Sequence, residues 1–505
     1  MDGRPLAIDE VADVSRRGRR VTLLGSARES MESTRAAMLV GAHGDRALYG
    51  INTGFGSFAS VRLSGADLAT LQANIVRSHS AGVGDPLPDD VVRATMVILA
   101  ASLARAKSGV RACVVESIVQ HLNDGVTPVV PSRGSVGASG DLAPLAHIAL
   151  ALIGEGTVRL GGRVMPAAEA HRARRIGALQ LAEKEGLALL NGTHLMAALG
   201  ALVMHDAHRV VQAAIAASAM ALDACRATHS ALDERIHHAR AQPGQQTIAR
   251  AVRRLLDGST IPASHKDNDP RVQDPYSLRA IPQVLGAALD ALEFARGAVE
   301  RELGAVTDNP LVFVEGRSAD IVSGANFHGM PLAIALDLVK IALSHVAGIS
   351  ERRTYWALSG HDRESRLPAH MSPRPGLESG LMIAQYTAAA CCNELRTLAY
   401  PSSVGNIPTC AGIEDYNSMG ATSALHAAAA VRLCRDVISC ELLVMAQGID
   451  HHRPLQSGIG VERVHAALRA VVPPLTGDRP LAPDIARIAE ALASGTIGAA
   501  ASIAR

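Results

Sequence analysis

The sequence has few aromatic residues. Phe, Trp and Tyr together make up 2% of its 505 residues, and there is a single Trp. A chain of this length can build an extensive core or several domains. Because rings are so scarce, we expect that core to be packed with aliphatic side chains, which form much of the 48% hydrophobic content. An aromatic residue inside a glycine-rich or polar motif therefore stands out.

The chain also lacks an ordered cysteine pattern. It has seven Cys, an odd number, and no Cys-x-x-Cys pair. This usage indicates buried thiols in a reducing compartment and argues against a disulfide framework or a zinc site. We therefore expect no metal and no diffusible cofactor.

Neither sign of charge is in excess. Lys and Arg number 49 against 48 Asp and Glu, which leaves a formal net charge of +1. The sequence therefore has no excess of basic charge that would attract a nucleic acid or an anionic membrane. No apolar run follows the first residues, and apolar stretches such as 142–153 are too short to span a bilayer or carry polar interruptions. We expect a soluble, cytoplasmic protein without a nucleic-acid or membrane partner.

Proline is absent from three long stretches, 167–242, 332–367 and 409–453. These stretches are rich in Ala, Leu, Val and Glu, which favours long helices. Their apolar content is too high for solvated single helices, so we expect the helices to form a bundle. We divide the chain into a loop-rich N-terminal part, 1–200, and a helical-bundle part, 201–505.

Three shorter elements have clear signals. Apolar residues recur at helical spacing between Ser64 and Arg77. Strand patterns are few, and one short hairpin is expected within 156–165. A helix near the C-terminus should begin at Pro483 and end before Gly495.

Small residues gather around Ala138-Ser139-Gly140, which Asp141 follows. A flexible loop would use Gly and Ser in this way. The alternative is a prosthetic group made from the chain itself. The Gly140 nitrogen can attack the Ala138 carbonyl, and Ser139 can lose water to leave an exocyclic double bond. This cyclisation needs no side chain on Gly140 and little bulk on Ala138.

All positions from Gly134 to Ala146 resemble the signature of the histidine and aromatic amino-acid ammonia-lyases. The resemblance runs from about residue 49 to residue 420. It implies a mainly α fold with a long central helical bundle of the fumarase/aspartase-like type. It also implies a homotetramer with shared active sites, and a 4-methylidene-imidazol-5-one (MIO) group formed from Ala138, Ser139 and Gly140. The wider fumarase and aspartase lyases lack the Ala-Ser-Gly trio.

A second glycine-rich run, 48–57, contains two of the scarce aromatics. It could be a surface turn, or a lid that brings a phenol over a pocket and excludes water. It resembles the family's Tyr-Gly-x-Asn-Thr-Gly-Phe-Gly loop. The resemblance implies that Tyr49 is the catalytic base and that Gly56 supports the loop.

His79 follows the helix expected at Ser64–Arg77. A His at a helix end can simply favour the helix dipole. In the family the matching pair contacts the substrate side chain, and Ser78-His79 resembles histidine-type members more than phenylalanine-type ones. Some tyrosine-type members also carry His at this position.

Asn191-Gly192 interrupts an apolar helical pattern, which could be a kink. The resemblance implies instead that Asn191 hydrogen-bonds beside the electrophile. His194 stands where histidine-type members commonly have Gln.

The run 272–279 contains an amide, a phenol and a guanidinium: Gln273, Tyr276 and Arg279. A surface helix with ion pairs is one interpretation. The run resembles the family's Gln-Asp-x-Tyr-Ser-x-Arg motif, in which the Arg binds the substrate carboxylate as a bidentate partner. If a helix opens at Asp274-Pro275, the three side chains lie near one another.

Two later runs also resemble family motifs. Asn326 and Phe327 lie in the run 323–329, and Phe327 matches a residue that packs near the substrate. Glu414 matches the Glu of histidine-type members, which accepts a hydrogen bond from imidazole, whereas phenylalanine- and tyrosine-type members usually have Gln. Its neighbours Ile413 and Tyr416 depart from the histidine-type pattern.

Taken together, the resemblance implies elimination of ammonia from L-histidine to give urocanate. The MIO electrophile would bond the substrate nitrogen, and the Tyr49 phenolate would remove the β-proton. Arg279 would hold the carboxylate, and His79 and Glu414 would hold the ring, with Asp141 supporting the electrophile. A tyrosine or phenylalanine lyase, a 2,3-aminomutase and a non-catalytic binding relative remain as alternatives.

Overall fold

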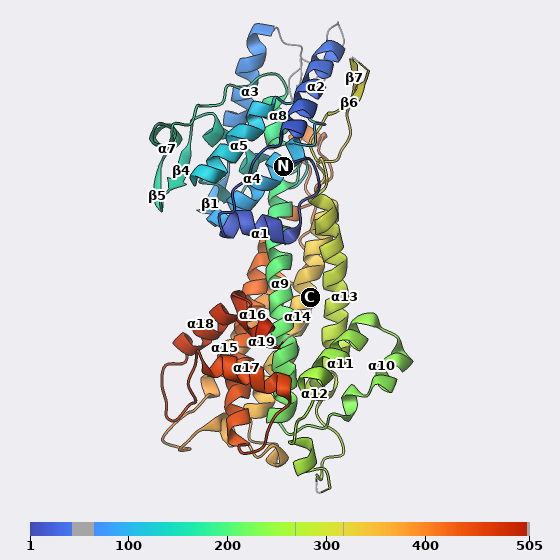
Figure 1. Ribbon diagram of the computed structural model, residues 1–505, viewed down its shortest axis with the longest axis vertical. Coiled ribbons are helices and arrows are strands. Elements are labelled where there is room, and N and C mark those ends of the chain that lie inside the picture. Colours follow the sequence, from blue (N-terminus) through green and yellow to red (C-terminus); the bar gives the residue numbers. More distant parts are fainter. Residues whose placement is uncertain (43–64, 268, 317, 502–505) are drawn as a thin grey trace. The chain divides into compact units, whose positions relative to one another are not determined.

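The computed structural model describes residues 1–42, 65–267, 269–316 and 318–501 (Figure 1). Tertiary contacts divide the chain into two compact units. Unit 1 consists of Met1–His205, Ala295–Asp337 and Pro401–Leu425. Unit 2 consists of Asp206–Phe294, Leu338–Tyr400 and His426–Arg505.

Helices dominate both units, so the expected mainly α fold is confirmed. Four long helices have residues in both units: α9 (His194–Ala224), α13 (Ile281–Glu302), α14 (Met330–Leu358) and α16 (Gly420–His451). The proline-free stretches contain α9, almost all of α14, and α16, because an interior proline would remove a backbone hydrogen bond and clash with the preceding turn.

Unit 1 holds most of the short elements. Its other helices are α1 (Ile8–Arg16), α2 (Gly25–Ala42), α3 (Gly65–His79), α4 (Asp89–Leu103), α5 (Ala112–Asp124), α6 (Leu142–Leu152), α7 (Ala167–Arg174), α8 (Glu185–Leu190) and η6 (Cys410–Gly412). Its strands are β1 (Val83–Pro86), β2 (Thr127–Pro128), β3 (Pro131–Arg133), β4 (Thr157–Leu160), β5 (Arg163–Pro166), β6 (Leu311–Glu315) and β7 (Ser318–Val322).

Three helices of unit 1 that adjoin candidate site residues pack on one another. Helix α3 contacts both α6 and α8, and α6 contacts α8. The loop lies between β3 and the start of α6, while His79 is the last residue of α3 and Asn191 follows α8. The helix expected at Ser64–Arg77 is thus confirmed as α3.

Two antiparallel hairpins flank unit 1. The expected hairpin is β4–β5, with Leu160 opposite Arg163, and α7 packs against both of its strands. The second hairpin, β6–β7, was not expected from the sequence. It packs on α2 through the buried pair Met38 and Val312.

Unit 2 contains the remaining elements. These are η2 (Ser230–Leu232), α10 (Glu234–Arg240), α11 (Pro243–Leu255), η3 (Pro262–Ser264), α12 (Tyr276–Arg279), η4 (Arg363–Ser365), η5 (Ala369–Met371), α15 (Met382–Leu398), α17 (Ile459–Arg469), α18 (Ala482–Ala493) and α19 (Thr496–Ala501). Helix α18 carries Pro483 in its first turn and ends before Gly495, as expected.

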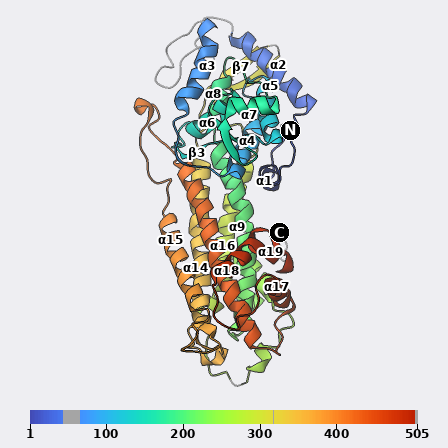
Figure 2. The ribbon, with the colours of Figure 1, turned by 90° about the vertical axis from the view of Figure 1, so that its left-hand side faces the viewer.

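Helices α14, α15 and α16 run alongside one another in unit 2 (Figure 2). A fully buried ion pair joins α14 to α16, with Arg353 Nη2 2.9 Å from Glu441 Oε2. Gln385 of α15 donates to Glu351 of α14 at 2.7 Å. Ser350 of α14 also donates to Glu441, so several buried polar contacts join these helices.

The core is aliphatic, as expected. In the parts of the chain that the structure describes, no Phe, Tyr or Trp is among the buried hydrophobic residues. All seven cysteines are free, and Cys225, Cys434 and Cys440 are buried. Helix α14 is long and apolar enough to cross a membrane by length and composition alone, but 61% of its most apolar window is buried inside the protein.

Candidate functional site

The loop at Ala138-Ser139-Gly140 is held close to the backbone of Gly192. Gly140 has a φ of +78° and pairs with Gly192 through an isolated β-bridge. A Cβ atom on Gly140 would lie 2.1 Å from the Gly192 carbonyl oxygen. Both the positive φ and the close approach require glycine at this position. Ala138 is buried, and Ser139 is half-buried.

Two separate segments bind Ser139. Its hydroxyl donates to Glu414 Oε1 at 2.7 Å. Its carbonyl oxygen accepts from Asn191 Nδ2 at 2.8 Å and from the Gly192 N–H at 3.4 Å. Since Asn191 follows α8 and Glu414 follows η6, the ends of two elements distant in the sequence meet at one residue.

Glu414 has a second partner that sequence reasoning did not identify. Thr409 donates its hydroxyl to Glu414 Oε2 at 2.8 Å, and its N–H donates to the Glu414 carbonyl at 2.8 Å. Both carboxylate oxygens of Glu414 therefore accept hydrogen bonds. The only sequence signal for this contact is that Thr409 lies before a turn containing Gly412 (φ +87°) that returns the chain.

Asp141 is a fully buried carboxylate that ties the loop to the start of α9. It accepts from the Ser135 hydroxyl at 2.8 Å and from the Met196 N–H at 3.0 Å. Its own N–H donates to the Gly192 carbonyl at 2.8 Å. Burial raises the pKa of Asp141 to about 6, although these donors favour the charged form.

His79 lies at the end of α3 with its Nδ1 3.1 Å from the Ser78 hydroxyl. Burial lowers the pKa of His79, and the negative charge of Glu414 opposes that shift to a smaller extent. The imidazole is therefore neutral at pH 7, and it lies within electrostatic range of the Glu414 carboxylate.

The run 323–329 reaches the same neighbourhood. Asn326 Nδ2 donates to the Val306 carbonyl at 3.3 Å, and Phe327 is half-buried. His328 forms a hydrogen bond of 3.0 Å with the carbonyl of Tyr416, and the two rings are stacked with centroids 6.4 Å apart. Ser418 then donates to the Gly137 carbonyl at 2.9 Å, which connects the segment after Glu414 to the Ala138-Ser139-Gly140 loop.

His194 is completely enclosed beneath this arrangement. Its side chain lies against Gly192, and within the described chain neither ring nitrogen has a hydrogen-bond partner. Burial lowers the pKa of His194 to about 3, and the charge of Arg105 adds to the shift. The residue is thus a neutral imidazole packed under the loop.

The other predicted residues belong to unit 2 or lie outside the described residues. Gln273, Tyr276 and Arg279 belong to unit 2, where α12 begins after Pro275. The guanidinium carbon of Arg279 lies 4.5 Å from the centre of the Tyr276 ring, and Tyr276 and Gln273 are exposed. Tyr49 and Gly56 lie outside the described residues.

The structure therefore brings together Ser139, Asn191 and Glu414 by direct hydrogen bonds, with His79 nearby. Among the described residues, no group of three or more His, Cys, Asp or Glu side chains is placed to hold a metal ion. The arrangement presents a carboxylate, an amide and a neutral imidazole around a loop of small residues.

Comparison with known proteins shows the family to which the chain belongs. A sequence model described as aromatic amino acid lyase matches residues 6–470. The chain belongs to this family.

The relatives include histidine ammonia-lyases and a tyrosine aminomutase. The chain is similar to the histidine ammonia-lyase of Sorangium cellulosum, with 46% identity over 504 residues, covering 99% of this chain and 98% of that protein. Its fold is similar to that of histidine ammonia-lyase from Trypanosoma cruzi (TM-score 0.91, 36% identity, 99% of this chain and 94% of that one). It is also similar to tyrosine aminomutase from Streptomyces globisporus (TM-score 0.93, 36% identity, 99% and 98% covered).

Proposed function

We propose that the protein is a carbon–nitrogen lyase that eliminates ammonia from L-histidine to give trans-urocanate. The observation that carries this proposal is the hydrogen bond between Ser139 and Glu414. It places the carboxylate that resembles the histidine-type pattern beside the residue that would become the electrophile. The similarity to enzymes named histidine ammonia-lyase supports the same substrate.

The residues of the loop fit an MIO group. The Gly140 nitrogen would bond to the Ala138 carbonyl carbon with loss of one water, and Ser139 would lose its hydroxyl and α-hydrogen as a second water. Gly140 has no Cβ to obstruct the closure, and its positive φ already turns the chain back. Asn191 and the Gly192 N–H would keep their bonds to the Ser139 carbonyl. Once formed, the group supplies the electrophile that activates the substrate amine.

The remaining residues would bind and deprotonate the substrate. Tyr49 would act as the base; since a free phenol has a pKa of about 10, its site must favour the anion. Neutral His79 and the Glu414 carboxylate would hold the imidazole ring. Arg279 would hold the substrate carboxylate as a charge-assisted pair.

The other proposed residues are supporting. Gln273, Tyr276 and Phe327 would line the substrate, and Gly56, Asp141 and Asn326 would support the loops. We further propose a cytoplasmic homotetramer in which each active site combines residues of several subunits.

A tyrosine-specific lyase or 2,3-aminomutase is the second candidate. Tyr416 stands where histidine-type members usually have His, and the fold is equally similar to that of a tyrosine aminomutase. An aminomutase would use the same electrophile but return ammonia to the β-carbon.

The test is to incubate the purified protein with L-histidine, L-tyrosine and L-phenylalanine separately. Ultraviolet absorbance would report urocanate or the cinnamates, and chromatography would detect β-amino acids. We expect urocanate from L-histidine and no β-amino acid. Formation of cinnamates or β-tyrosine without urocanate would contradict the proposed substrate but would not contradict the proposed electrophile.

A further inference from the structure

The motif that carries Gln273, Tyr276 and Arg279 has little regular structure to hold it. Helix α11 ends at Leu255, and only the three-residue η3 precedes α12. Helix α12 itself is four residues long. Such short helices have few internal hydrogen bonds and depend on tertiary contacts. Because α13 begins only after Arg279, at Ile281, the N-terminal side of the motif must be fixed by other contacts in unit 2.

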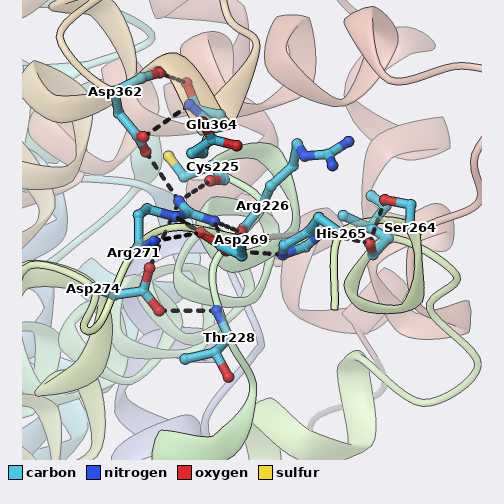
Figure 3. Close-up of polar contacts among 12 residues, drawn as sticks. Cys225, Arg226, Thr228, Ser264, His265, Asp269, Arg271, Asp274, Asp362 and Glu364 are labelled. Atoms are coloured by element: carbon cyan, nitrogen blue, oxygen red, sulfur yellow. Dashed lines mark hydrogen bonds and ion pairs between the residues drawn. The ribbon is translucent and has the colours of Figure 1, made fainter. Parts of the chain in front are cut away.

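Arg271 is the group that makes those contacts (Figure 3). Its guanidinium forms a fork on Asp269, with Nε 3.0 Å from Oδ1 and Nη2 2.7 Å from Oδ2. Nη1 donates to Asp362 Oδ2 at 3.0 Å and to the Cys225 carbonyl at 3.2 Å. Nη2 also donates to the Arg226 carbonyl. One side chain thus uses all five of its N–H donors on three segments of the fold.

The partners of Arg271 come from rigid parts of unit 2. Cys225 and Arg226 directly follow α9, and carbonyls at a helix C-terminus favour a cation. Asp362 caps η4, where its other oxygen accepts from the Glu364 N–H at 3.2 Å. The hydrogen bonds from Arg271 lower the pKa of Asp269 to about 2, so the fork stays charged at neutral pH.

A second anchor follows immediately. Asp274 is buried and accepts from the Thr228 N–H at 2.8 Å, while its other oxygen is 3.7 Å from Arg271 Nη1. Between the two anchors, Val272 is 96% exposed. The half-buried Arg271 and the buried Asp274 hold the chain on both sides of the exposed Val272 and Gln273, so residues 272–279 form a short arm that is held at its base.

The chain contains its own comparison for this arrangement. Arg235 forks on Asp233 with the same geometry, Nε 3.0 Å from Oδ1 and Nη2 2.6 Å from Oδ2. That pair is local, and the Arg235 side chain is 91% exposed, whereas the Arg271 side chain is 13% exposed. The Asp-x-Arg turn alone therefore does not require burial. The additional contacts of Arg271 with Asp362 and the α9 end are what distinguish it.

We propose that Arg271 is a positioning residue for substrate binding, which fixes the base of the 272–279 arm so that Arg279 meets the substrate carboxylate. This inference rests on the proposed function of Arg279. Arg271 itself would not touch the substrate. Its loss would let the arm shift, and binding of the carboxylate would weaken in the ground state and the transition state alike.

The first experiment replaces Arg271 with Lys in the full protein. Lysine keeps the charge but cannot form the fork and the carbonyl contacts together. Uniform loss of carboxylate binding raises KM and leaves kcat nearly unchanged. We expect KM for L-histidine to rise about tenfold, the size of one charge-assisted hydrogen bond. Arg235→Lys is the matched control and should leave KM unchanged; an unchanged KM in Arg271→Lys as well would overturn the proposal.

A double-mutant cycle tests whether Arg271 acts through Arg279. If it does, Arg271→Lys has no further effect once Arg279 is Ala, and the double variant has the KM of Arg279→Ala alone. Two KM effects that multiply would overturn the proposal, because Arg271 would then act independently of Arg279. If Arg271→Lys does not fold, Asp362→Asn removes one contact only. We expect a smaller rise in KM from it and the same non-additivity.

Hydrogen exchange tests the role of Arg271 without depending on the proposed enzymatic activity. Within the arm, the N–H groups of Leu278, Arg279 and Ala280 donate to the carbonyls of Pro275 and Tyr276. In Arg271→Lys we expect faster exchange at these amides and unchanged exchange in α14 and α16. A wild-type protein without histidine turnover would defeat the proposed function while leaving this readout intact. Unchanged exchange in the arm would overturn the role of Arg271.

Discussion

At the scale of single residues, the central contact is between Ser139 and Glu414, which are 275 positions apart in the chain. Glu414 accepts from the Ser139 hydroxyl on one oxygen and from Thr409 on the other. A glutamine could accept only on one side, and its NH2 group would face a hydroxyl that now donates. A carboxylate accepts on both sides without either hydroxyl having to rotate into an accepting position.

Glu414→Gln tests the proposed ring contact. A hydrogen bond to a charged group contributes about 1.5–3 kcal/mol, so kcat/KM for L-histidine should fall by about ten- to a hundredfold. Turnover of L-tyrosine, if any, should fall less. Steady-state absorbance assays give both values. The adjacent and exposed Asp415→Asn is the matched control, and an equal loss in that variant would show that charge near the loop, rather than the Glu414 contact, is responsible.

At the scale of elements, the decisive feature is the break between α8 and α9. Helix α8 ends at Leu190, Asn191 follows it, Gly192 has a φ of +133°, and α9 begins at His194. The break turns a carbonyl and an N–H of the 191–192 backbone toward the Ala138-Ser139-Gly140 loop. A continuous helix would have used both groups internally, and the loop would have lost its binding partners.

Gly140→Ala should disrupt this pairing. Its Cβ would lie 2.1 Å from the Gly192 carbonyl, so the two backbones must separate. Gly162→Ala is the matched control, because Gly162 has a φ of +79° with open space around it and should lose only about 1–2 kcal/mol. We expect Gly140→Ala to lower the thermal midpoint well beyond the control and to retain its full encoded mass. Equal midpoints would contradict the pairing.

His194 at the start of α9 gives a pH prediction. Its folded pKa is lowered to about 3, below an unfolded value of about 6.5, so the unfolded state binds more protons between these values. Stability is therefore lost as pH falls below about 6.5, by about 1.4 kcal/mol per unit of pH for this group. In His194→Gln the fall in thermal midpoint from about pH 7.5 to about pH 5 should be smaller than in the wild type.

The control for this measurement is His238→Gln, since the His238 side chain is 59% exposed. We expect the thermal midpoint of His238→Gln to fall with pH by the same amount as that of the wild type. If the thermal midpoint of His194→Gln falls with pH as much as that of the wild type, protonation of His194 is not coupled to unfolding.

At the scale of the whole molecule, the proposed site residues are divided between the two units. Ser139, Asn191 and Glu414 belong to unit 1, whereas Gln273, Tyr276 and Arg279 belong to unit 2. A homotetramer with shared sites would let one chain supply the electrophile and another supply the carboxylate contact. Oligomerisation would then be a condition for activity.

Mixing inactive chains tests this sharing. Ser139→Ala should be inactive, and Arg279→Ala, whose KM should be strongly raised, should turn over little L-histidine at a low concentration, but co-expressed chains should form mixed assemblies in which about a quarter of the sites are intact. Light scattering gives the number of chains, and absorbance gives the regained activity. No regained activity in confirmed mixed tetramers would mean that each site takes both residues from one chain.

Much of the fold could be predicted from the sequence, because its signals are local. The proline-free stretches indicated α9, α14 and α16, and Pro483 with Gly495 delimited α18. The hairpin β6–β7 was missed, because its alternation is weak and its apolar residues include Phe313 and Val314, which are exposed. Strand pairs of five residues carry little pattern from which they can be predicted.

Candidate site residues could be proposed from the sequence only where they lie in contiguous motifs, and their roles stay predictions. Ala138, Asn191 and Glu414 could each be assigned within a run of characteristic residues. Thr409 and Arg271 could not, because their roles depend on which distant groups the chain brings beside them. Arg271 and Arg235 are both in Asp-x-Arg turns, and only the tertiary contacts distinguish them.

The measurement that tests the central claim most directly is the intact mass of the purified protein, with Ser139→Ala measured beside it. If Ala138-Ser139-Gly140 forms the electrophile, the wild-type mass is lower than the encoded mass by two water molecules. A peptide spanning the loop would carry the whole difference. Ser139→Ala has no hydroxyl to lose and cannot form the double bond, so it cannot show the full deficit. A wild-type protein with its full encoded mass would contradict the account.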